Sequence, residues 1–175
     1  IILSFVAVIR KAADPPRNFL GLVPGHSEFL ALDRFKHAYP VQNIVIYRFS
    51  SNLFFANVAI FQKDIMDSVL DDTKAVIVDA SAVGSVDVTA AKTLRIMYDT
   101  LRDMGVKLYI TEHIGQLNVQ LRKLGLGDMI ESGCVRQSIE RALSDCGLES
   151  PYPLVGVHNS YHDIRRKRAE NMAQE

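Results

Sequence analysis

The sequence has little cysteine and no excess of charge of either sign. Lys and Arg together number 20, as do Asp and Glu, so no net field would attract nucleic acid or an acidic partner. Cys134 and Cys146 form no CxxC pair and no cluster, which argues against a disulfide framework and against a structural zinc site. From the cysteines we expect a reducing compartment. From the balanced charge we expect no nucleic-acid partner.

No apolar run reaches the roughly 18 to 20 residues that a membrane span needs. The N-terminal stretch IILSFVAVI ends at Arg10 and Lys11 and lacks the features of a complete signal peptide. Two interpretations stay open for it. It is either a first helix or strand packed on the domain, or the end of a transmembrane helix whose basic border marks the cytoplasmic side.

The motifs of common enzyme classes are also absent. The sequence has no GxSxG elbow, no GxxxxGK[ST] phosphate loop and no GxGxxG after a strand. His158 and His162 have the spacing of a metal pair but no third ligand nearby, and the basic run at 165–168 is interspersed with acidic residues. We expect no catalytic residue, no cofactor and no metal.

What is present is an alternation of strand and helix patterns. Strands are predicted at 43–49, 75–80 and 107–111, with a short edge strand at 28–32 and a connector at 14–27 rich in Pro and Gly. Helical periodicity predicts helices over 57–70, 88–105, 114–125 and 135–146. This order is typical of an α/β fold, a largely parallel sheet flanked by helices.

The stretch VDASAVGSVDVT, residues 78–89, is the best candidate for a site. The strand carboxylate Asp79 leads into a loop of small residues that feeds a helix N-terminus, where free N–H groups favour an anion or phosphoryl group. The candidate interaction, anion or nucleotide-binding residues are Ser81, Gly84, Ser85, Asp87 and Thr89. In the competing interpretation, Asp87 is a helix N-cap that satisfies those donors itself.

A second notable stretch, RFSSNLFFAN, brings Phe49, Phe54 and Phe55 close to Asn57 between a strand and a helix. These rings could stack on a base or a flavin. Packing into the core at the junction explains them more simply, and we expect them in the core.

Three stretches of the sequence carry a family resemblance. VIVDASAVGSVDVTAAKTLRIMYDTLRDMGVKLYI resembles the central segment of STAS domains. YRFSSNLFFANVAIF and PPRNFLGLVPG resemble the first strand–helix junction and the preceding linker of STAS domains in SulP-type sulfate and anion transporters. The likeness covers residues 1–147.

The resemblance implies a small mixed, largely parallel sheet flanked by helices, in a non-catalytic regulatory domain on the cytoplasmic side of an anion permease. It divides the chain into the end of the last transmembrane helix (1–13), a linker (14–27), the STAS domain (28–147) and a C-terminal tail (148–175). The implied partners are the transporter's own membrane portion, a cytosolic regulatory protein and a second copy of the chain.

The alternative is a freestanding interaction protein of the anti-sigma factor antagonist kind. In those proteins a serine directly after the motif aspartate is phosphorylated as a switch. Here Asp87 matches the aspartate, but Val88 follows it and carries no hydroxyl. Thr89, one position later, is the remaining candidate for phosphorylation.

Overall fold

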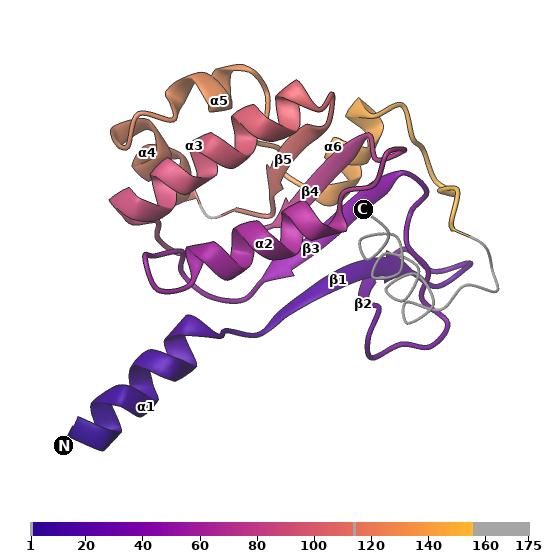
Figure 1. Cartoon of the computed structure of the whole chain (residues 1–175). Coiled ribbons are helices and arrows are strands. Elements are labelled where there is room, and N and C mark those ends of the chain that lie inside the picture. The colour runs from indigo at the N-terminus through magenta and orange to yellow at the C-terminus, as the bar shows by residue number, and fades with distance from the viewer. Residues whose placement is uncertain (1, 114, 156–175) are drawn as a thin grey trace.

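The computed structural model describes residues 2–113 and 115–155, and these form one α/β unit with a projecting N-terminal helix (Figure 1). The elements in chain order are α1 (Ile2–Ala13), β1 (Arg17–Leu22), β2 (Phe29–Ala31), β3 (Ile44–Phe49), α2 (Val58–Ser68), β4 (Ala75–Asp79), α3 (Val88–Asp103), β5 (Lys107–Thr111), α4 (Gly115–Lys123), α5 (Gly127–Glu131) and α6 (Ile139–Asp145).

The five strands form one mixed sheet in the order β2-β1-β3-β4-β5. β3, β4 and β5 run parallel, with Val45 opposite Val76 and Val76 opposite Leu108, whereas β1 pairs antiparallel with both β3 and β2. The parallel strands are almost entirely apolar because helices cover both of their faces. The α/β class, the three parallel strands and the edge strand at 28–32 are confirmed.

Alternate residues of the strands point into two separate cores. On one face, Tyr47 and Phe49 of β3 pack with Phe61 of α2 and with Leu94 and Met97 of α3. The opposite face packs against α6, whose buried residues are Ile139, Ala142 and Leu143. Figure 1 shows α2 and α3 on the first face and α6 on the second.

The strand β1 lies inside the segment predicted as a connector, and no strand was predicted there. Gly21 gave that segment the look of a turn, yet it sits within the strand at a close approach of two backbones. A Cβ at Gly21 would lie 2.4 Å from the carbonyl oxygen of Tyr39. Here glycine provides space for a neighbouring chain, so its presence does not mark a turn.

The helix predicted over 135–146 is wrong in its first turn. Val135 forms a parallel bridge with Ile110, which keeps the chain extended there, and Ser138 then caps α6 by accepting a hydrogen bond from the Arg141 N–H. The short helix α5 was not predicted. Of the helix predicted over 114–125, α4 covers 115–123, and Ile114 lies outside the described residues.

The N-terminal stretch is helical and extends away from the sheet (Figure 1). Leu3 and Val8 are 86% and 65% exposed, so the helix α1 is not packed on the domain as one of the two interpretations required. Within the described residues, no helix combines the length and the apolar character needed to cross a membrane. The histidine pair at 158 and 162 and the basic run at 165–168 lie outside the described residues.

Candidate interaction site

The loop predicted as a site, residues 81–89, joins β4 to α3 at the edge where the parallel strands end. Ser81 and Thr89 are exposed, while Gly84, Ser85 and Asp87 are half-buried. Four of the five candidate residues therefore lie in the loop that follows β4, and Thr89 lies in the first turn of α3. Such loops are common positions for binding residues.

Three consecutive backbone donors of this loop already have side-chain acceptors within the domain. The side-chain oxygen of Asn52 accepts hydrogen bonds from the N–H groups of Gly84 and Ser85, at 2.8 and 3.0 Å. Gln120 accepts from the Val86 N–H at 3.1 Å. Binding of an anion would require these N–H groups to be free, but all three donate hydrogen bonds within the domain. A partner of this part of the loop would therefore contact its side chains.

Asp87 has the capping role that competed with ligand binding, and it has a second role as well. One carboxylate oxygen accepts from the Ala90 N–H at 2.7 Å, which caps α3. The other oxygen accepts from the Phe55 N–H at 2.9 Å. Asp87 thus ties the start of α3 to the turn before α2, and no sequence signal pointed to this second bond.

The three phenylalanines of the RFSSNLFFAN stretch differ in burial, and the expectation that all of them lie in the core is wrong. Phe49, on β3, is fully buried and meets Phe61 edge-on at a centroid distance of 5.2 Å. Phe54 is half-buried and Phe55 is 69% exposed. The strand has ended before Phe54, so the alternation that directs Phe49 inward no longer acts on the later rings.

Asn57 is the residue that sequence reasoning noticed but gave no role. Its side chain is fully buried, accepts from the Phe54 N–H at 3.0 Å and donates to the carbonyl of Asn52 at 2.9 Å. It also donates to the carbonyl of Ala12, at the end of α1, at 3.3 Å. An asparagine just before a helix suggests a cap, yet this side chain makes no capping bond to α2.

A second set of contacts holds the start of β1. Arg17 donates from Nε to Asp64 of α2 at 2.6 Å, and the Tyr47 hydroxyl donates to the same carboxylate at 2.8 Å. Burial opposes the charge of Arg17, but hydrogen bonds to Asp14 and Asp64 outweigh it and raise the pKa of the guanidinium. Asn57 and Arg17 together fix the direction in which α1 leaves the domain.

The strand carboxylate Asp79 is buried and paired within the domain. It accepts from Nε of Arg48 at 2.7 Å and from the Ser81 N–H at 3.0 Å. Asp79 therefore fixes the beginning of the 81–89 loop. Among the residues that the structure describes, no group of three or more His, Cys, Asp and Glu side chains could hold a metal ion.

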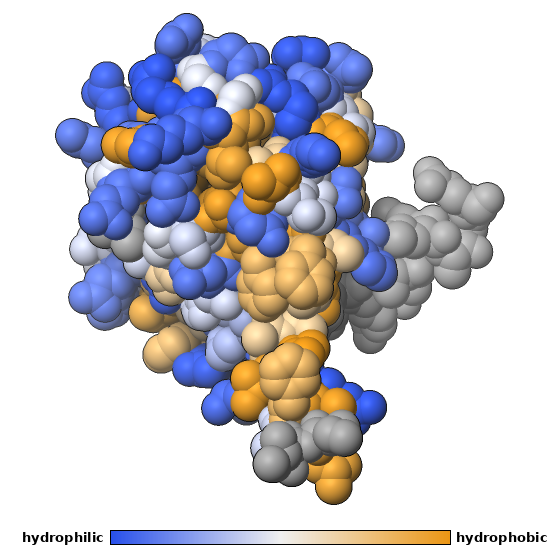
Figure 2. Space-filling model, turned by 90° about the vertical axis from the view of Figure 1, so that its left-hand side faces the viewer, coloured by the Kyte–Doolittle hydropathy of each residue, from blue (hydrophilic) through white to orange (hydrophobic). Residues whose placement is uncertain are grey.

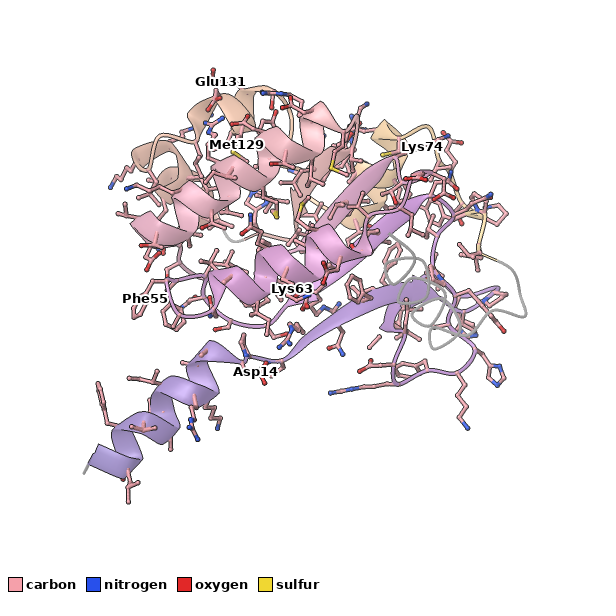
Figure 3. All side chains as sticks on the ribbon, in the orientation of Figure 1. Asp14, Phe55, Lys63, Lys74, Met129 and Glu131 are labelled. Atoms are coloured by element: carbon pink, nitrogen blue, oxygen red, sulfur yellow. The ribbon has the colours of Figure 1, made fainter. Side chains whose placement is uncertain are left out.

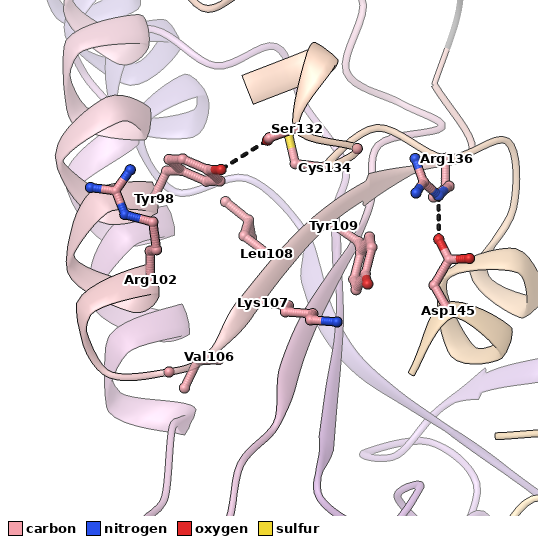
Figure 4. Close-up of a pocket in the computed structure, with 12 residues that line it drawn as sticks. Tyr98, Arg102, Val106, Lys107, Leu108, Tyr109, Ser132, Cys134, Arg136 and Asp145 are labelled. Carbon is pink, nitrogen blue, oxygen red and sulfur yellow. Dashed lines mark hydrogen bonds and ion pairs between the residues drawn. The ribbon is translucent and has the colours of Figure 1, made fainter. Parts of the chain in front are cut away.

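A crevice of about 550 Å³ lies beside the amino-terminal half of β5 (Figure 4). The guanidinium of Arg102 lies 5.7 Å from the centre of the Tyr98 ring and pairs with Asp99, while Arg136 pairs with Asp145. Burial raises the pKa of the Cys134 thiol in this crevice to about 12, so the thiol stays protonated at neutral pH. Because these charges are already paired, we assign the crevice no ligand.

Comparison with known proteins identifies the architecture. The sequence profile of a family described as STAS domain matches residues 37–146. A probable sulfate transporter of Mycobacterium tuberculosis is 29% identical over 133 residues, covering 74% of this chain and 24% of that protein. A probable sulfate transporter of Arabidopsis thaliana is 24% identical over 139 residues, covering 73% and 20%. The chain thus spans about a fifth to a quarter of the length of these relatives.

Solved structures share the fold. An anion transporter of the murine Solute Carrier 26 family superposes with a TM-score of 0.76 at 21% identity, over 84% of this chain and 24% of that one. The STAS domain of a SulP transporter from Vibrio cholerae gives 0.51 at 23% identity, over 66% and 89%. A protein from Thermotoga maritima described as a putative anti-sigma factor antagonist gives 0.52 at 18% identity, over 61% and 92%.

Proposed function

The chain belongs to the STAS domain family, and from this membership we propose that it is the cytosolic regulatory and interaction domain of a SulP-type transporter for sulfate or a related anion. It has no catalytic activity of its own in this proposal. The relatives described as sulfate transporters support the assignment, because the matched region is a minor part of each of them. The similarity to an anion transporter extends over 84% of the chain, beyond the 37–146 segment matched by the family profile.

The observation that carries the proposal is the form of α1. It is an apolar helix with a basic border at Arg10 and Lys11, it projects from the domain, and its last turn is held by Asn57. An apolar helix that ends in basic residues is the pattern expected at the cytoplasmic end of a transmembrane helix. Residues 1–13 are then the end of the last membrane helix, and 14–27 a linker that contains β1. Residues 28–147 form the STAS domain and 148–175 the tail.

In this assignment the 81–89 loop is a contact surface for the membrane portion or for a cytosolic regulator. Contact through side chains suits the loop better than anion binding, because Gly84 and Ser85 donate to Asn52. The exposed hydroxyl of Thr89 is the candidate for phosphorylation, with Val88 beside it at the usual serine position. A second copy of the chain is a further candidate partner.

The alternative is a freestanding protein of the anti-sigma factor antagonist kind. The likeness to the Thermotoga maritima structure favours it, since that protein is matched over 92% of its length. Its TM-score of 0.52 is below the 0.76 of the anion transporter. In a freestanding protein, the apolar side chains of the projecting helix α1 would also be exposed to water without a function.

The reading frame upstream of Ile1 tests the two functions directly. The transporter proposal expects several hydrophobic spans there, whereas an initiating Met close to residue 14 would support the freestanding protein. Sulfate uptake by cells that express the whole reading frame then tests the regulatory role. Deletion of 28–147 should change uptake. An unchanged uptake rate at equal membrane abundance would contradict a regulatory function.

A further inference from the structure

Three apolar side chains that reach the surface lie beside the candidate loop, and we call the half-buried Phe54 and the exposed Phe55 and Val88 the aromatic platform. Phe55 is 69% exposed and Val88 is 59% exposed. The rings of Phe54 and Phe55 meet edge-on, 5.6 Å apart. The hydrogen bond from the Phe55 N–H to Asp87 brings the two phenylalanines to the start of α3, where Val88 follows.

The backbone beneath these rings is fixed. Asn57 accepts from the Phe54 N–H and Asp87 accepts from the Phe55 N–H, at 3.0 and 2.9 Å. Two consecutive amides are therefore held by side chains from different parts of the chain. A side chain on a fixed backbone binds a partner well because little backbone freedom is lost on contact. Exposing a Phe ring to water has no benefit for folding.

The platform lies next to the point where α1 joins the domain. The Asn57 side chain that holds Phe54 also donates to the carbonyl of Ala12 in α1. Figure 3 shows Phe55 at the end of the domain that faces α1, and Figure 2 shows hydrophobic side chains continuing from the projecting helix onto the face of the domain. The basic residues Arg10 and Lys11 lie in the last turn of α1, between its apolar part and the platform.

We propose that the aromatic platform docks on a lipid surface with anionic headgroups. The apolar side chains of α1 enter the acyl region, Arg10 and Lys11 lie among the headgroups, and the Phe54–Phe55 pair enters the interface beside them. The inference rests on the proposed membrane attachment through α1, and it names the part of the domain that meets the lipid.

The charge and the hydropathy of α1 and of the platform favour an anionic lipid surface as the partner. Exposed Leu3, Phe5 and Val8 suit hydrocarbon, and a basic border next to an apolar segment is attracted to anionic lipids. Phe rings carry no polar group to hydrogen-bond, so they gain from leaving water without losing a partner. The domain would then be held with the 81–89 loop against the membrane.

A single tryptophan at position 55 tests the contact, because residues 1–175 contain none. The 175-residue chain carrying Phe55→Trp is mixed with phosphatidylcholine vesicles, with and without phosphatidylserine. We expect the Trp emission to shift to the blue with the anionic vesicles, and brominated lipid to quench it. Met104→Trp is the matched control. Met104 is 53% exposed at the far end of α3, about 24 Å along the helix axis, and its emission should not change.

Arg10→Gln should weaken binding to the anionic vesicles about fivefold, the factor that corresponds to about 1 kcal/mol per basic residue at such a surface. Lys123→Gln, an exposed lysine of α4, should leave the binding unchanged.

Each other outcome contradicts the proposal in a different way. If the chain binds vesicles through α1 while Trp at 55 keeps its aqueous emission, the platform does not meet lipid, and the membrane attachment survives. If the chain does not bind vesicles at all, the attachment through α1 fails and the platform proposal fails with it. A blue shift without vesicles that grows with protein concentration would assign the platform to a second copy of the chain.

Discussion

Two pairs of aromatic rings near the junction of β3 and α2 have nearly the same ring geometry and different environments. Phe49 and Phe61 meet at 5.2 Å and 81° and are 0% and 1% exposed. Phe54 and Phe55 meet at 5.6 Å and 84°, yet Phe55 is 69% exposed. An edge-on contact therefore does not identify a core. The buried pair stabilises the fold. Polar side chains hold the backbone amides of Phe54 and Phe55, which we call the exposed pair after the ring of Phe55, and that ring is available to a partner.

The largest effect should come from the buried pair. Phe49→Ala removes a fully buried ring between β3 and α2 and leaves a cavity, so we expect a loss of about 3–5 kcal/mol in the free energy of unfolding. Urea unfolding followed by circular dichroism measures it. A loss below about 1 kcal/mol would mean that the core closes around the missing ring. The stability effects of the buried and the exposed pair would then no longer differ clearly.

The next effect concerns the polar support of the exposed pair. Asn57→Ala leaves the partly buried Phe54 N–H without its acceptor, and we expect a loss of about 1–3 kcal/mol. Amide exchange in the last turn of α1 should also become faster, since the bond to Ala12 is removed. Asn18→Ala is the control, because Asn18 bonds Asp33 at the surface. Equal exchange in both variants would show that Asn57 does not hold α1.

A smaller effect is expected at the cap. Asp87→Ala should lower the free energy of unfolding by about 1 kcal/mol, because the Ala90 N–H loses its acceptor. Asp87→Ser keeps an acceptor for α3 and should lose less stability. If uptake by the whole transporter survives both changes, Asp87 is only a cap. Should the serine variant fold normally and lose uptake, the contact role of the 81–89 loop is supported.

The smallest effect on folding is predicted for the exposed ring itself. Phe55→Ala should change the free energy of unfolding by no more than about 0.5 kcal/mol, since most of the ring already contacts water. The same urea titration measures it beside Phe49→Ala. A loss close to that of Phe49→Ala would place Phe55 in the core and remove the basis of the comparison.

Much of the architecture follows from local pattern. The apolar runs at 75–80 and 107–111 and the stripes of α2 and α3 predicted their elements to within two residues, because burial on two faces or on one imposes a distinct period on the sequence. The cap at Asp87 was also foreseen as one of two roles. These features depend on residues close together in the chain.

Other features depend on contacts between distant segments, and the sequence could not fix them. β1 is a strand because it pairs with β3, and its Gly21 is required by a carbonyl of Tyr39. The extended Val135 is held by Ile110, which shortens the last helix. A local pattern that predicts a connector or a helix cannot anticipate such partners.

At the candidate site the division is the same. The sequence by itself determined the α/β class, the loop at 81–89 and an aspartate able to cap α3. Only the tertiary structure decided that Asn52 and Gln120 occupy the loop amides, that Asn57 reaches the end of α1, and that Phe55 faces water. The physical reason is that hydrogen-bond satisfaction and burial are set by whichever groups the fold brings together, and those groups lie far apart in the chain.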